Sequence, residues 1–138
     1  MPGVKGQDGG VLTSMLLYAL EEGLIDSAVV TVKSEEEPWK PLPIVAQTSE
    51  DVLRSRGSIY VHSLTMETLM SAIKKGSRSI AFVGPSCNID AFRNGSCTVC
   101  TDLTAEKADL SFGGVGSKEG YTTVLARTGL GLELFKDA

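Results

Sequence analysis

The sequence predicts an α/β fold, a single domain with a mixed β-sheet and flanking helices, and three observations support this prediction. A helical pattern at residues 11–22 is followed within a few residues by a β-branched apolar run at residues 28–32. A second helical pattern, at residues 64–75, precedes the apolar run at residues 80–83. Glycine or proline lies at the ends of these segments. Helices that alternate with short apolar strands are typical of a layered α/β domain.

In the first third of the chain we expect one helix, one buried strand and one edge strand. Gly23 follows the first helical pattern as a C-terminal cap would. Residues 28–32 have the composition of a buried strand. The acidic residues 34–38 predict a solvated turn, and the prolines of residues 39–46 suit an edge strand or the start of a strand. We expect the only tryptophan, Trp39, to be a packing residue.

Two further helices are expected before the next strand. Thr48, with Asp51 three residues later, has the pattern of a helix start, and Gly57 would end this short helix. Residues 64–75 make the next helix, which ends in two lysines and a glycine, as helices commonly do. The apolar side chains of that helix are spaced to form one buried face: Leu64, Leu69, Met70 and Ile73.

The rest of the chain predicts two strands, a ligand-lining loop and a terminal helix. After the strand at residues 80–83 the chain must turn, and residues 88–93 have the pattern of a short helix. The glycines and serines of residues 110–117 predict a loop whose backbone could line a ligand. Residues 121–128 predict a strand, and residues 129–138 predict a turn followed by a helix.

The composition favours an ordinary globular domain and argues against several classes of function. Of 138 residues, 22% are charged and 42% hydrophobic, and this length can bury a core without disulfides. The net charge of −4, without a run of Lys and Arg, argues against a general nucleic-acid binder. No apolar run reaches the roughly 18 residues of a spanning helix, and no signal pattern is present. We therefore expect no membrane insertion and a cytoplasmic location.

A glycine-rich loop leads into the first helix, and two interpretations of it are open. The loop reads Gly6-Gln7-Asp8-Gly9-Gly10. Backbone amides at such a helix start can approach a phosphate closely, although the spacing matches neither a P-loop nor a dinucleotide fingerprint. Alternatively, the glycines supply backbone with positive φ and Asp8 caps the helix.

The three cysteines lie within fourteen residues and are the strongest chemical signal of the sequence. Cys97 and Cys100 are spaced to reach one metal ion or cluster, and Cys87 could add a third ligand. Three cysteines cannot all pair within one chain. Two alternatives are a structural zinc site, and a role without ligation in which Cys87 is a small core residue and the pair is inert or redox-labile.

Six motifs occur in order along nearly the whole chain. They are GQDGGVLT at residues 6–13, PWKP at 38–41, GSIY at 57–60, VGPSCNIDAFR at 83–93, CTVCTDLT at 97–104 and ADLSFGGVGS at 108–117. Together they resemble the motifs of the beta subunit of coenzyme F420-reducing hydrogenase, a family that includes related dehydrogenase and reductase subunits. Several ordered motifs are far more specific than any single one.

The resemblance implies a cytoplasmic flavoprotein module that binds FAD, carries an iron–sulfur cluster of the 4Fe-4S type and transfers a hydride between the flavin and coenzyme F420. Such an enzyme would be an F420-dependent oxidoreductase, with other redox subunits or a second copy of the chain as its partners. We assign no proton-transfer residue, because hydride transfer depends on close stacking of cofactors more than on an acid or base from the protein.

The resemblance also implies which residues contact the cofactors. Cys87, Cys97 and Cys100 would be cluster ligands, and the fourth ligand is not identified. The cofactor-binding residues would be Gly6, Gln7, Asp8, Gly9, Gly10, Thr13, Ser58, Tyr60, Ser63, Gly116 and Ser117.

The chain departs from the family in its length. Family members have a long segment between the counterparts of Arg93 and Cys97, where this chain has only Asn94-Gly95-Ser96. Because Asn-Gly suits a tight turn, we expect residues 1–138 to form a shortened single domain that lacks this segment. An alternative function follows from the loss: a cofactor-free structural or protein-interaction module, trimmed by nature or by engineering, that keeps the fold without catalysis.

Overall fold

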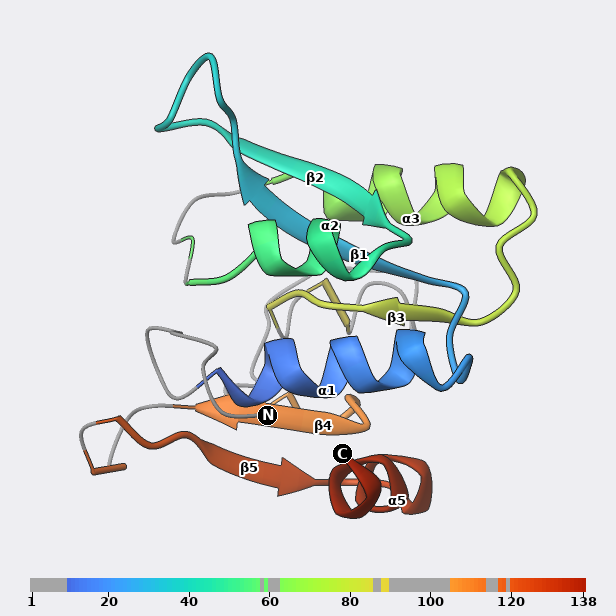
Figure 1. The fold of residues 1–138 in the computed structure, drawn as a ribbon, viewed down its shortest axis with the longest axis vertical. Coiled ribbons are helices and arrows are strands. Elements are labelled where there is room, and N and C mark those ends of the chain that lie inside the picture. Colours follow the sequence, from blue (N-terminus) through green and yellow to red (C-terminus); the bar gives the residue numbers. More distant parts are fainter. Residues whose placement is uncertain are drawn as a thin grey trace.

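The computed structural model describes residues 10–57, 59, 63–85, 88–89, 105–113, 117–118 and 120–138. These residues form an α/β structure with four helices, a three-stranded mixed sheet and a two-stranded sheet (Figure 1). The predicted mixed sheet with flanking helices is therefore confirmed, whereas the second sheet was not expected. None of the helices formed by the described residues is long and apolar enough to span a bilayer.

The central strand of the larger sheet is β1 (Ser27–Lys33), the β-branched run of the sequence. It pairs antiparallel with β2 (Pro41–Ala46) and parallel with β3 (Ile80–Phe82). Ala28 and Val29 of β1 are completely buried because both faces of the sheet are covered. The prolines of β2 fit its position as an edge strand, as expected from the sequence.

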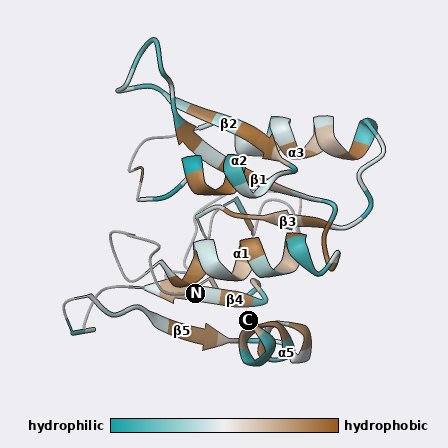
Figure 2. Cartoon of the chain, in the orientation of Figure 1, coloured by the Kyte–Doolittle hydropathy of each residue, from teal (hydrophilic) through white to brown (hydrophobic). Residues whose placement is uncertain are grey.

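One face of this sheet is covered by α1 (Val11–Glu21) and α2 (Ser49–Arg54), and the other by α3 (Thr65–Lys74). Figure 1 shows α2 in front of the strands and α3 behind them. The buried cluster on the first face comprises Leu16, Leu17, Ala28, Val30, Ala46 and Val52. Figure 2 shows the hydrophobic strands between the helices and the hydrophilic turn that joins β1 to β2.

The predicted buried face of α3 is wrong for three of its four residues. Leu69 is buried, but Leu64 is 70% exposed, and Met70 and Ile73 are also exposed. The residues that face the sheet are Thr65, Leu69 and Ala72, which follow one another at helical spacing. Two of these three side chains are small, which lets the helix approach the sheet closely. The prediction relied on the large apolar residues and therefore assigned the wrong face of α3 to the core.

The prediction that Trp39 is a packing residue is also wrong, because its side chain is 74% exposed. Trp39 lies in the turn between β1 and β2, which extends beyond the helices (Figure 1). The Ser34 N–H donates to the Lys40 carbonyl oxygen at 3.2 Å across this turn, and Lys40 pairs with Glu37 at 2.9 Å. The acidic part of the turn is solvated, as expected.

The second sheet consists of β4 (Leu110–Gly113) and β5 (Thr123–Ala126), which pair antiparallel, and it is followed by α5 (Gly129–Asp137). The loop predicted for residues 110–117 is therefore wrong at its first four residues. Although these residues include glycine and serine, apolar residues alternate with them, so that Leu110 and Phe112 lie on one face of the strand. The expected strand at residues 121–128 is confirmed at a shorter length, and so is the terminal helix.

The ends of the helices follow the sequence signals closely. Gly23 has a φ of 68° after α1, and the Leu24 N–H donates to the Ala19 carbonyl oxygen at 2.9 Å, as in a Schellman motif. Gly57 likewise has a positive φ after α2. Thr48 and Asp51 form the predicted capping box at the start of α2.

Asp26 connects the loop before β1 to the loop before β3. Its carboxylate accepts hydrogen bonds from the Arg78 N–H at 2.6 Å, the Ser79 N–H at 3.1 Å and the Ser27 hydroxyl at 2.8 Å. These bonds lower the pKa of Asp26, and the bond from the Arg78 backbone has the largest effect. The carboxylate form is therefore stabilised in the folded protein.

We expect Asp26→Asn to lower the free energy of unfolding at neutral pH. Because the pKa of Asp26 is lowered by folding, its contribution is present above the unfolded pKa and is lost as the pH falls through the folded pKa. Urea unfolding of both proteins from about pH 7 to about pH 2 should show their stabilities converging toward low pH. Glu36→Gln, in an exposed turn, is the control. Equal stability of Asp26→Asn and the unchanged protein at neutral pH would contradict this role.

Candidate functional site

The candidate site lies at the edge of the sheet where β1 and β3 end, which we call the carboxyl edge. The two strands are parallel, with Ser27 opposite Ile80 and Val29 opposite Phe82, so both end on the same side. Each is preceded by a helix that runs back across the sheet, so α1 and α3 both begin at this side (Figure 1). In open α/β sheets, ligands bind outside the carboxyl ends of parallel strands.

At the start of α1, the first backbone amides have no acceptor among the residues that the structure describes. Gly10 is its N-cap, with a left-handed φ of 72°, and no side chain of the N-cap satisfies an amide. The first intrahelical bond is from the Ser14 N–H to the Gly10 carbonyl oxygen at 3.0 Å, so the preceding amides have no acceptor within the helix. Positive φ is confirmed at Gly10, while Asp8, the predicted cap, lies outside the described residues.

The start of α3 is tied by side-chain hydrogen bonds to β1 and to the segment that follows β3. The hydroxyls of Ser63 and Thr31 are 3.3 Å apart, which links the segment just before α3 to the middle of β1. The Asn88 amide donates to the hydroxyl of Thr65 at 2.6 Å, and Thr65 is almost fully buried. The Val83 N–H also donates to the Val29 carbonyl oxygen at 3.1 Å. The chain is thus anchored at the carboxyl edge both before and after Ser86-Cys87.

Ser117, another predicted cofactor contact, lies in the connection between β4 and β5. Its hydroxyl is 2.6 Å from the Thr123 hydroxyl and 3.4 Å from the Gly113 carbonyl oxygen. These two contacts hold the connection together and leave the hydroxyl one further acceptor position. In the view of Figure 1, β4 runs toward the same side of the molecule as the start of α1.

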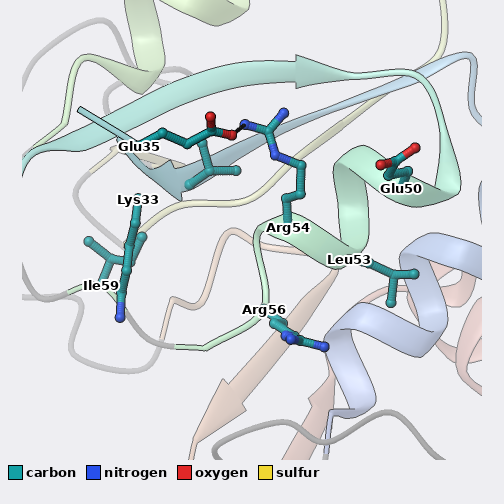
Figure 3. Close-up of a pocket in the computed structure, with 8 residues that line it drawn as sticks. Lys33, Glu35, Glu50, Leu53, Arg54, Arg56 and Ile59 are labelled. Atoms are coloured by element: carbon teal, nitrogen blue, oxygen red, sulfur yellow. Dashed lines mark hydrogen bonds and ion pairs between the residues drawn. The ribbon is translucent and has the colours of Figure 1, made fainter. Parts of the chain in front are cut away.

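An open pocket of about 470 Å³ lies at the end of β1, on the face covered by α2 (Figure 3). It is lined by Val32, Lys33, Glu35, Glu50, Leu53, Arg54, Arg56 and Ile59. Arg54 and Glu35 form an ion pair at 3.2 Å within it. These charges could not be selected from the sequence, because they are separated along the chain and belong to no motif. The only local signal is Ile59, which stands between two predicted cofactor contacts, Ser58 and Tyr60.

The described part of the chain includes four of the predicted cofactor contacts: Gly10, Thr13, Ser63 and Ser117. Gly10, Thr13 and Ser63 lie where α1 and α3 begin, so the structure gathers them at one edge. Within the described ranges, no three His, Cys, Asp or Glu side chains are grouped as metal ligands would be. The remaining predicted site residues lie outside these ranges: Gly6, Gln7, Asp8, Gly9, Ser58, Tyr60, Gly116, Cys87, Cys97 and Cys100.

The fold and the edge define the chain as an α/β protein with its candidate site at the ends of two parallel strands. Residues 3–70 match the family described as coenzyme F420 hydrogenase/dehydrogenase, beta subunit N-term, and residues 61–138 match the C terminus described for the same beta subunit. The chain belongs to the coenzyme F420 hydrogenase/dehydrogenase beta subunit family. The resemblance inferred from the six motifs is therefore confirmed.

Curated relatives and a solved structure agree with this assignment. The chain is 25% identical to the coenzyme F420 hydrogenase subunit beta of Methanosarcina barkeri, over 97% of this chain and 73% of that protein. It is 27% identical to the coenzyme F420-dependent sulfite reductase of Methanocaldococcus jannaschii, of which it spans only 34%. A chain from the F420-reducing [NiFe] hydrogenase complex of Methanosarcina barkeri superposes with a TM-score of 0.88 at 26% identity, over 97% of this chain and 73% of that chain.

The comparisons also show that this chain is a shortened form. The alignment with the Methanosarcina barkeri relative runs over 214 residues, which is longer than this chain of 138. That relative therefore has positions without a counterpart here.

Proposed function

We propose that this chain is a flavin- and iron–sulfur-dependent redox module that transfers a hydride between FAD and coenzyme F420. The observation that carries the proposal is the carboxyl edge, where the starts of α1 and α3 and the exit of β3 converge in a member of this family. An open edge with free amides and hydroxyls suits a ligand with phosphates and polar ring atoms.

The residues of this edge would bind and orient FAD. The first amides of α1, together with the hydroxyl of Thr13, would donate hydrogen bonds to polar groups of the cofactor on one side of the sheet. Ser63, held by Thr31, would contact it from the start of α3. Gly6, Gln7, Asp8, Gly9, Gly10, Ser58, Tyr60, Gly116 and Ser117 complete the proposed set. Bound FAD supplies the hydride chemistry, while the protein supplies position and electrostatics.

The three cysteines are the proposed ligands of an iron–sulfur cluster, with a fourth ligand still to be identified. Of the residues close to Cys87 in the chain, Asn88 is described, and its side-chain amide donates to the Thr65 hydroxyl at 2.6 Å. The Asn88 N–H also donates to the Pro85 carbonyl oxygen at 2.9 Å.

We further propose that residues 1–138 fold as a single domain and that the missing positions fall between Arg93 and Cys97. The proposed partners are other redox subunits, as in the hydrogenase complex that contains the structural relative, or a second copy of this chain. The proposed location is the cytoplasm. Coenzyme F420 is the proposed substrate.

A cofactor-free interaction module is the second candidate, and it is favoured by the apolar side chains that the described residues leave exposed. On α5, Leu130 is 68% exposed and Phe135 45% exposed, and Tyr121 before β5 is 68% exposed. In a shortened chain such a surface could mediate assembly without catalysis. This candidate predicts a colourless protein whose stability is unchanged by FAD.

We expect FAD at about 100 times its dissociation constant to raise the free energy of unfolding by about 2.7 kcal/mol. Gly10→Ala should remove this increase, because a side chain at this left-handed position would disturb the start of α1. Gly76→Ala, which also replaces a glycine of positive φ but lies at the far end of α3, should keep it. Thermal unfolding with and without FAD measures both. No stabilisation of the unchanged chain would favour the interaction module.

A further inference from the structure

The pocket at the end of β1 contains two basic side chains without a partner among the described residues. Lys33 and Arg56 both line it, and the described part of the chain provides neither of them with an ion pair or a side-chain hydrogen bond. Arg54, the third cation, is already neutralised by Glu35 at 3.2 Å. Two cations are therefore available to a ligand, and both side chains are exposed.

The same pocket offers apolar contacts beneath these cations. Val32 is 1% exposed and belongs to the wall formed by the sheet, and Leu53 and Ile59 add apolar surface from α2 and from the segment after it. Its volume of about 470 Å³ is that of a pocket for a small molecule rather than a single ion. Five of the eight lining residues are charged, so charged groups make up most of this lining and the apolar surface is the smaller part.

The charges are distributed unevenly around the pocket. Figure 3 shows Lys33 and Glu50 on opposite sides of Arg54, with the Lys33 amine directed away from the Glu35–Arg54 pair. Because Glu35 is occupied by Arg54, the uncompensated negative charge is that of Glu50. The region of Lys33 and Arg56 is therefore the positive part of the pocket, and the region of Glu50 is its negative part.

We propose that this pocket binds a phosphate-bearing small molecule, with Lys33 and Arg56 contacting the phosphate and Leu53 and Ile59 contacting its apolar part. A phosphate has enough acceptor oxygens to bind an amine and a guanidinium at once. Both side chains are long and exposed, so they can turn toward a shared anion. This proposal depends on the proposed function in one respect: both place a phosphate-bearing ligand at the carboxyl edge of the sheet.

The test compares ligands that differ in their phosphate and variants that differ in the position of the lost charges. Isothermal titration calorimetry would use riboflavin, FMN and inorganic pyrophosphate. We expect Lys33→Ala with Arg56→Ala to weaken FMN binding by roughly tenfold or more, since charge-assisted hydrogen bonds are lost. Riboflavin, without a phosphate, should bind unchanged. Lys74→Ala with Lys75→Ala removes the same charge at the far end of α3 and should leave FMN binding unaffected.

Each outcome separates this inference from the proposed function. If flavins bind and the Lys33/Arg56 double variant binds FMN as well as the unchanged chain does, the inference is wrong and the flavin module stands. If no flavin binds but pyrophosphate binds the unchanged chain and not that variant, the phosphate site stands and the flavin module fails. If neither flavins nor pyrophosphate bind, both fail. Circular dichroism of the variants checks that they are folded.

Discussion

Gly131→Ala should lower the free energy of unfolding by about 2–3 kcal/mol, as expected for an overpacked contact. Gly131 is buried in the first turn of α5, where that helix crosses the start of β4. A Cβ atom there would overlap the Asp109 carbonyl oxygen and would lie 2.8 Å from the carbonyl carbon. Since the obstacle is backbone, no rotation of a side chain can relieve it.

The contact also matters because Asp109 accepts two further hydrogen bonds from the two residues that connect β5 to α5. Its carbonyl oxygen accepts from the Arg127 N–H at 2.9 Å, and its carboxylate accepts from the Thr128 hydroxyl at 2.8 Å. The Thr128 hydroxyl in turn accepts from the Gly131 N–H at 3.1 Å and so caps α5. Displacing the Asp109 backbone would strain all of these bonds together.

Gly129→Ala is the matched control for this prediction. Gly129 lies in the same helical turn, but a Cβ atom there would meet nothing within 4 Å. Alanine favours helix over glycine by up to about 1 kcal/mol, so this variant should be as stable as the unchanged chain or slightly more so. Urea unfolding of both variants separates the cost of the overlap from the effect of helix propensity. Equal free energies of unfolding for the two variants would show that α5 can move away from β4 without loss of stability.

Cys97→Ser with Cys100→Ser should abolish iron binding, if the proposed cluster is present. Serine oxygen is a poor replacement for thiolate in iron–sulfur ligation, and two ligands are removed at once. Iron content and visible absorption of anaerobically purified protein measure the effect, with flavin quantified on the same samples. We expect the iron to fall to background while the flavin content is retained.

Thr98→Ser with Thr101→Ser is the control for the cysteine variant, because it changes the same stretch and keeps all three sulfurs. This variant should contain as much iron as the unchanged chain. Iron retained after both cysteines are replaced would refute the cluster assignment. Zinc in the unchanged chain, in place of iron, would identify the cysteines as a structural metal site.

Local features of the fold were predictable from the sequence because they depend on neighbouring residues. The capping box of Thr48 and Asp51 and the positive φ of Gly23 and Gly57 are decided within one or two helical turns. The buried strand β1 was likewise evident, since a β-branched run favours extended backbone whatever its partner. The family could also be recognised from the sequence, since its motifs are ordered along the chain.

Errors arose where the outcome depended on a distant partner. The strand at Leu110–Gly113 exists because β5 pairs with it, and its own composition favours a loop. The buried face of α3 was misassigned because a helix with small residues can lie closer to a sheet than one with large residues. Trp39 is exposed because the turn that carries it extends away from the core.

The sequence by itself determined the α/β class, the helix ends and the family, and it predicted ligand contacts at the starts of α1 and α3. Only the tertiary structure decided that these starts share one edge, because β1 and β3 are parallel although about fifty residues of chain separate them. It also decided that Lys33 and Arg56 line one pocket, and that Thr31 meets Ser63. Such side chains become neighbours only when long loops are closed by the burial of the apolar strands between the helices.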